Sequence, residues 1–191
     1  ELAGCGSSTR GVIGGGQSPN PSQVDTIQYV EFATSGNTSD FGNLTVARRS
    51  LGSFSSATRG VWGGGESGNK DTIDYVTISS AGNASDFGDL SKTTGSRCGN
   101  VASNTRGVTY LGNGNSIEYI TIGSTGNSTD FGDADASNKH GDGVSSNILG
   151  LFIIGTYNVE TTQFVTIATT GNTTSSGDLT LDVAGDITLQ P

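Results

Sequence analysis

The chain has 191 residues, of which 31 are glycine and only 3 are proline, and its formal net charge is −9. This acidic balance disfavours nucleic acids and anionic membrane surfaces as partners, because binding to phosphates needs a basic surface. No apolar run approaches the roughly 20 residues of a membrane-spanning helix, and no signal-peptide pattern follows Glu1. Methionine is absent, so we expect a processed product or a part of a longer protein.

Internal repetition is the strongest pattern in the sequence. The glycines that precede an asparagine lie at positions 36, 82, 126 and 171, so successive copies are 46, 44 and 45 residues apart. Each copy has a glycine-rich apolar stretch, then an alternating apolar strand, then a segment rich in turn residues. Disordered chains lack a recurring apolar face of this kind, so we expect an ordered protein.

The first copy opens at 9–16 with Thr-Arg-Gly, two apolar residues and three glycines. Matching stretches lie at 58–65 and 105–112, and a diverged one lies at 150–155. Glycines in such strands allow backbones to approach one another closely. We therefore expect these stretches to lie near the axis of the fold.

Residues 27–32 form the central predicted strand of the first copy. Alternation places Ile27 and Tyr29 on one face and Val30 and Phe32 on the other. Both faces are partly apolar, as a sheet packed between two other sheets requires. The Gly-Asn pair at 36–37 is expected to supply the positive φ angles of a tight hairpin turn. No segment has the apolar spacing of a helix, so helix should be minimal.

The triplet Asp-Phe-Gly follows in the first three copies, at 40–42, 86–88 and 130–132. Neither a phosphate loop nor the catalytic-loop motif of a kinase accompanies it. A structural role is predicted instead, in which the aspartate caps a turn, the phenylalanine packs between repeats and the glycine adopts an unusual φ.

Short strands, two-sided sheets and a period of about 46 residues favour an all-β, propeller-like fold of four antiparallel blades. The expected single domain, 1–191, has units of approximately 5–54, 55–100, 101–147 and 148–191. Residues 1–8 and 178–189 are candidates to share one blade and close the ring. The alternatives are a β-solenoid and a fibre in which the C-terminal strand pairs with the next molecule.

Arginines that occupy one repeat position form the first candidate site: Arg10, Arg59 and Arg106. One interpretation makes them a ring of ligand contacts, for example to acidic sugars. The favoured interpretation is structural, with each guanidinium bonded to carbonyls or to an aspartate of the neighbouring blade.

Carboxylates that cluster in the third repeat form a second candidate site, a weak Ca²⁺ site: Asp130, Asp133, Asp135 and Asp142. The alternative is a set of solvated turns. The chain has a single histidine, His140, so a copper site with several histidine ligands is excluded. His140 is expected in a solvated loop, and the cysteines and histidine have no recognised zinc-binding spacing. No other cofactor is predicted. Cys5 and Cys98 are interpreted as separate buried thiols, with a disulfide left open.

Three segments of the second copy carry a resemblance: Thr58-Arg-Gly-Val-Trp-Gly-Gly-Gly65, Ile73-Asp-Tyr-Val-Thr-Ile78 and Gly82-Asn-Ala-Ser-Asp-Phe-Gly-Asp-Leu90. The pattern resembles kelch-type, galactose-oxidase-like propeller repeats. More closely, it resembles repeats in virion proteins of marine and freshwater bacteriophages, including phages of cyanobacteria. The resemblance implies a virion protein such as a tail fibre or a tail or head appendage.

The expected function is therefore a non-enzymatic structural or adhesive module. Its expected partners are copies of itself, other virion proteins and a host-surface glycan or protein, with no nucleic acid and no membrane insertion. The expected location is the virion. The alternative is an adhesin or filament subunit on the bacterial extracellular surface.

Overall fold

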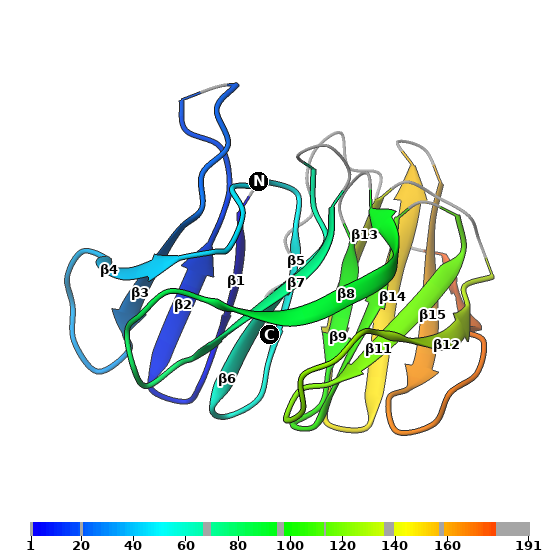
Figure 1. The fold of residues 1–191 in the computed structure, drawn as a ribbon. Coiled ribbons are helices and arrows are strands. Elements are labelled where there is room, and N and C mark those ends of the chain that lie inside the picture. The colour runs from blue at the N-terminus through cyan, green and yellow to red at the C-terminus, as the bar shows by residue number, and fades with distance from the viewer. Residues whose placement is uncertain are drawn as a thin grey trace.

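The computed structural model describes residues 2–19, 21–66, 70–94, 98–112, 114–135, 140–156 and 159–178. Within these ranges the regular structure is entirely β, with 16 strands in four antiparallel sheets of four strands. Figure 1 shows the four sheets side by side in chain order. Accordingly, no helix in the described ranges is long and apolar enough to span a membrane.

The sheets are formed by consecutive strands. Sheet 1 contains β1 (Ala3–Gly6), β2 (Arg10–Gly14), β3 (Thr26–Glu31) and β4 (Ser39–Asn43). Sheet 2 contains β5 (Gly52–Ser55), β6 (Arg59–Gly63), β7 (Lys70–Thr77) and β8 (Ser85–Thr94). Sheet 3 contains β9 (Gly99–Ala102), β10 (Arg106–Tyr110), β11 (Ser116–Thr121) and β12 (Thr129–Asp133). Sheet 4 contains β13 (His140–Ser145), β14 (Leu149–Thr156), β15 (Val159–Thr166) and β16 (Thr174–Asp178).

A serine-capped hairpin begins every sheet. In sheet 1 the Ser7 amide donates to the Arg10 carbonyl at 2.9 Å, and the Ser7 hydroxyl accepts from the Arg10 amide at 3.2 Å. Ser56, Ser103 and Ser146 make the equivalent bonds in the other sheets. The strand before each Thr-Arg-Gly position therefore pairs with the strand after it. For this reason β5, β9 and β13 begin new sheets, whereas the boundaries of the sequence-based units fell within β5 and β9 and after β13.

The predicted all-β class is confirmed, and so is the division into antiparallel sheets that follow the repeat. The β-solenoid alternative is wrong for the described residues, because each strand pairs with its neighbours in the chain rather than with equivalent strands of adjacent repeats. Contacts between inner strands run from β1 to β5, from β5 to β9 and from β9 to β13. These described strands form no closed ring. Residues 179–191, on which the proposed ring closure depended, lie outside the described residues.

The core consists of three apolar layers, one between each pair of neighbouring sheets. Between sheets 1 and 2, Ile27 and Phe41 pack with Trp62, Val76 and Ile78. The central strands contribute to layers on both of their faces, as their two-sided apolar pattern predicted. Trp62 is fully buried, and its indole N–H donates to the Ala3 carbonyl at 3.0 Å.

Cys5 and Cys98 form no disulfide with each other. Cys98 is buried, and its burial raises the pKa of the thiol to about 11. Burial likewise raises the pKa of Cys5 to about 12. In the unfolded chain both thiols regain the ordinary pKa of about 8.5.

We expect Cys98 to make the protein less stable at alkaline pH. The unfolded thiol ionises first as the pH rises, so this contribution is complete below about pH 8.5 and decreases until about pH 11, by up to roughly 1.4 kcal/mol per pH unit. Urea unfolding at pH 8 and at higher pH will measure the decrease in the free energy of unfolding. Cys98→Ala should make the decrease smaller, with Cys5 accounting for part of what remains, and parallel pH curves for the two proteins would contradict the assignment.

Candidate functional site: the interface between sheets

An arginine joins each of the first three sheets to the next. The guanidinium carbon of Arg59 lies 4.4 Å from the ring centroid of Tyr75, in its own sheet. Its Nη1 donates to the Ile122 carbonyl of sheet 3 at 2.8 Å. Tyr75 also contacts Phe87 edge to face, with centroids 5.8 Å apart. The same arrangement joins sheet 1 to sheet 2 and sheet 3 to sheet 4: Arg10 on Tyr29 with Ile78, and Arg106 on Tyr119 with Ile167.

The three repeat arginines thus have equivalent surroundings. Each guanidinium combines a cation–π contact with a charge-assisted hydrogen bond to a backbone carbonyl. Arg10 also forms an ion pair with Glu31 of its own sheet. Leu149 occupies the arginine position in sheet 4, where it pairs with Thr166 as Arg106 pairs with Thr121. The contact is therefore made at each of the three junctions between the sheets.

A second contact uses the Gly-Asn pair. The Gly126 amide of sheet 3 donates to the Phe87 carbonyl of sheet 2 at 2.7 Å, and the Ser128 amide donates to the Asp89 carbonyl at 2.8 Å. The Asp89 amide in turn donates to Oδ1 of Asn127 at 3.1 Å. Asn83 and Asn172 make the equivalent side-chain bonds to Asn43 and Asp133. The loop therefore covers the free edge of the outer strand of the preceding sheet, which protects that edge from other pairing.

The Gly-Asn pair was expected to form a tight hairpin turn, and this expectation is wrong. In sheet 3, β11 ends at Thr121 and β12 begins at Thr129, so residues 122–128 form a longer connection. Gly126 and Asn127 lie near its end, where they bond to sheet 2. A local pattern could not reveal this role, because the partner strand belongs to the preceding repeat.

A third contact, missed from the sequence, uses the polar residue inside the central strand. Glu118 is only 2% exposed, and its carboxylate accepts from the Ser91 amide of sheet 2 at 3.0 Å. The Gln163 carbonyl oxygen accepts from the Asp135 amide at 2.8 Å. Asp74 occupies the same position in sheet 2 and is fully buried. The available signal was one polar residue between an isoleucine and a tyrosine in each of the first three copies.

We expect Asn127→Ala to lower the free energy of unfolding by about 0.5–1.5 kcal/mol, because the Asp89 amide loses its acceptor in a solvent-exposed hydrogen bond between sheets. Asn37 is the matched control, since it holds the same repeat position in sheet 1, which no other sheet precedes in the described chain. Asn37→Ala should change stability by less than about 0.5 kcal/mol in dilute solution. Urea denaturation followed by Trp62 fluorescence measures both values, and equal losses would contradict the role of the loop.

The predicted Ca²⁺ ligands come from two different sheets. Asp130 and Asp133 belong to β12, the outer strand of sheet 3, and Asp135 follows it. Asp142 belongs to β13, the inner strand of sheet 4, and its carboxylate accepts from the Gly143 amide at 2.8 Å. Among the side chains that the structure describes, no three acidic, histidine or cysteine residues form a group suited to a metal ion. The Ca²⁺ site remains a prediction that calorimetric titration with Ca²⁺ tests, and the His140 side chain is outside the described set.

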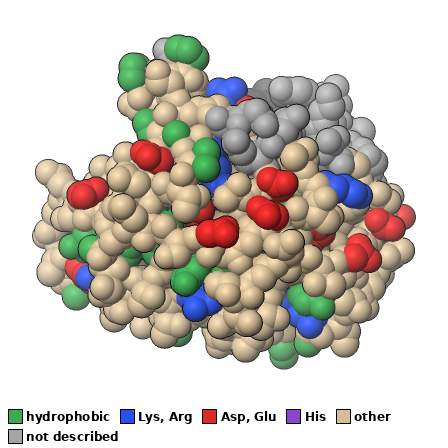
Figure 2. Space-filling model, viewed as in Figure 1, with side chains coloured by type: hydrophobic (Ala, Val, Ile, Leu, Met, Phe, Trp, Pro, Cys, Tyr) green, Lys and Arg blue, Asp and Glu red, His purple; other side chains and the backbone are tan. Residues whose placement is uncertain are grey.

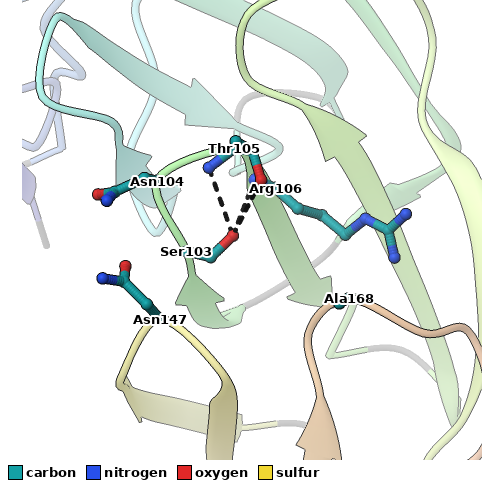
Figure 3. Close-up of a pocket in the computed structure, with 6 residues that line it drawn as sticks. All are labelled: Ser103, Asn104, Thr105, Arg106, Asn147 and Ala168. Carbon is teal, nitrogen blue, oxygen red and sulfur yellow. Dashed lines mark hydrogen bonds between the residues drawn. The ribbon is translucent and has the colours of Figure 1, made fainter.

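A polar pocket of about 390 Å³ lies between the hairpin ends of sheets 3 and 4. Figure 3 shows the Asn104 and Asn147 amides on its two sides and the Arg106 side chain extending away from them. The Ser103 hydroxyl accepts from the amides of Thr105 and Arg106 at 3.3 and 3.1 Å. The remaining lining residue is Ala168. Free amide groups in an open pocket offer both hydrogen-bond donors and acceptors to a polar ligand.

The molecular surface in Figure 2 carries acidic side chains over the outer strands β4, β8 and β12. These strands contain exposed carboxylates, among them Asp40, Asp86 and Asp130. Basic side chains are fewer on this face. The surface in view is therefore mainly negative, like the chain as a whole, and offers no basic stripe of the kind that binds phosphates.

No protein-family model matches the sequence, and no curated protein matches it. The class of protein is therefore defined by the arrangement of its sheets. In its described ranges, the chain is a repeat protein of four antiparallel sheets held together by one set of contacts used three times.

Proposed function

We propose that the chain is a non-enzymatic structural and adhesive module of a bacteriophage virion, such as a tail fibre or a tail or head appendage. In this proposal the four sheets are blades of a propeller-like assembly. The observation that carries it is the use of the repeat-specific polar side chains, namely the arginines, the asparagines and the buried acceptors, in bonds between sheets. The virion location is proposed because the repeats resemble those of bacteriophage virion proteins.

The proposed partners are copies of the chain, other virion proteins and a host-surface glycan or protein. The pocket between sheets 3 and 4 supports the adhesive part, because its amide and hydroxyl groups suit the hydroxyl groups of a sugar. Asn104 and Asn147 line two sides of this pocket. A glycan array tests the assignment, and Asn104→Ala with Asn147→Ala should abolish any binding that the unmodified chain shows.

Immunogold electron microscopy tests the location. Antibodies against the chain should label an appendage of the virus particles. Labelling of the bacterial surface instead would favour the alternative, an extracellular adhesin or filament subunit. The release of sugar from a host polysaccharide by the purified chain would contradict the non-enzymatic assignment.

A further inference from the structure

The sheet–sheet interface has two faces, and each end of the row of sheets carries one of them. We call the face of sheet 4 that corresponds to the covered faces of sheets 1–3 the trailing face. Its exposed apolar members are Val144, Leu149 and Phe164. The face of sheet 1 that corresponds to the covered faces of sheets 2–4 is the leading face, and it includes Gly11, Gln28 and Phe32. The register of the strands defines both sets.

The trailing face exposes side chains that are covered in the other sheets. Val144 pairs with Leu151 as Phe54 pairs with Val61. Phe54 lies over Gly107 of the next sheet so closely that a methyl group on this glycine would be 2.7 Å from the ring. Val144 has no such neighbour in the described chain and is 39% exposed.

The arginine–tyrosine pair is replaced on this face by two apolar residues. Leu149 and Phe164 occupy the positions of Arg106 and Tyr119. They are 49% and 40% exposed. A partner on the trailing face would therefore bury aliphatic and aromatic surface without burying a charge, which avoids the cost of desolvating an ion.

The leading face shows the complementary change. Phe32 is 61% exposed, whereas Ile78, Ile122 and Ile167 at the same position are at most 1% exposed. Its ring lies over Gly11, and a methyl group on this glycine would be 3.2 Å from it. In sheets 2–4 the equivalent glycine is covered by the preceding sheet. Hydrophobic side chains are visible at this end of the molecule, at the left edge of Figure 2.

The polar groups of the leading face also have no preceding sheet to bond to in the described chain. Gln28 is exposed, although Asp74, Glu118 and Gln163 at its position are buried. Asn83, Asn127 and Asn172 bond to the outer strand of the preceding sheet, whereas Asn37, at the same position, belongs to the first sheet. The leading face therefore carries each of the groups that the three internal junctions use on that side.

We propose that a second copy of this chain docks head to tail, with its leading face on the trailing face of the first. Phe32 of one copy then packs against Leu149 and Phe164 of the other, at the position where an isoleucine meets the arginine–tyrosine pair inside the chain. The Asn37 loop takes the place beside β16 that the equivalent loops take beside β4, β8 and β12. The new junction would continue an interface that the chain already makes three times between its own sheets.

This contact is heterologous, since its two faces differ. Such contacts produce closed rings when the rotation between copies closes and filaments when it does not. Blocking either face should stop growth, and two chains blocked on opposite faces should still form one junction. This property distinguishes the proposal from a symmetric dimer, in which both copies use the same surface.

Sedimentation velocity on the full chain between roughly 1 and 100 μM tests the proposal. The unmodified chain should self-associate, and Phe32→Asp or Leu149→Asp should each raise the dissociation constant by at least about tenfold. An equimolar mixture of the two variants should form a dimer and nothing larger. Thr121→Asp, which adds the same charge at an exposed position of sheet 3, should leave association unchanged.

A monomeric unmodified chain, single variants that associate normally, or a variant mixture that stays monomeric would each overturn the inference. Trp62 fluorescence verifies that the variants are folded, and Asn37→Ala provides a milder variant that should weaken association without a change of core. The inference rests on the assembly role proposed above. The two are separable, because particle labelling in immunogold microscopy does not depend on association of the purified chain.

Discussion

Asp74→Asn is expected to lower the free energy of unfolding by about 3–5 kcal/mol, because it leaves a buried arginine without its counterion. Asp74 and Arg48 form an ion pair of 2.6 Å in which both side chains are fully buried. Arg48 also donates to the Thr72 carbonyl at 2.7 Å, and the Thr45 hydroxyl donates to Asp74. The pair links the loop after β4 to β7 and so joins sheet 1 to sheet 2.

The carboxylate of Asp74 compensates the buried positive charge of Arg48. Burial lowers the pKa of the guanidinium, and the charge and hydrogen bond of Asp74 oppose that change. Without Asp74, folding has to bury an uncompensated positive charge. The instability should therefore come from the remaining arginine rather than from the lost contact alone.

A double variant separates these two causes. Arg48→Met combined with Asp74→Leu removes both charges and fills similar volume, so it should be more stable than Asp74→Asn alone. Urea unfolding followed by the fluorescence of the single tryptophan, Trp62, measures each variant. A loss below about 1 kcal/mol for Asp74→Asn would mean that the ion pair does not hold the two sheets together.

Gly42→Ala is expected to cost about 2–5 kcal/mol, since it combines backbone strain with a steric clash between sheets. Gly42 has a φ of 147°. A methyl group on it would lie 2.4 Å from the Gly82 carbonyl oxygen in the loop of the next sheet. Backbone atoms form the obstacle, so no side-chain rotation relieves the contact.

The opposite side of the same contact provides the control. A methyl group on Gly82 would meet no atom within 4 Å, so Gly82→Ala should cost less than about 1 kcal/mol. Thermal or urea unfolding of the two variants compares them directly. Equal losses would show that the general cost of replacing a glycine, rather than the close approach of the two sheets, sets the stability at these positions.

The sequence predicted much of the architecture because the relevant signals are local. Alternation at Ile27, Tyr29, Val30 and Phe32 indicated a strand with two apolar faces, and the equivalent strand of sheet 2 confirms this, because Ile73 and Val76 lie in different layers. The prediction of unusual φ values for the glycine in Asp-Phe-Gly is also confirmed, with 147°, 144° and 146° at Gly42, Gly88 and Gly132. The limits of the units were harder to place, because either strand of a serine-capped hairpin could begin a repeat.

The candidate site was less accessible. Position in the repeat identified Arg10, Arg59 and Arg106, but it did not identify their acceptors. The bonds that they make join residues 68, 63 and 61 positions apart. The role of Asn127 and its equivalents was likewise hidden, because its partner belongs to the outer strand of the preceding sheet.

By itself, the sequence determined a four-copy, all-β chain of antiparallel strands, since alternation, turn residues and period act over a few residues. Only the tertiary structure decided which polar groups bond between sheets and which apolar faces stay uncovered. The physical reason is that every sheet repeats one pattern, whereas the surroundings of that pattern depend on whether another sheet lies against it. Phe32 and Ile78 hold the same position, and only packing makes one exposed and the other buried.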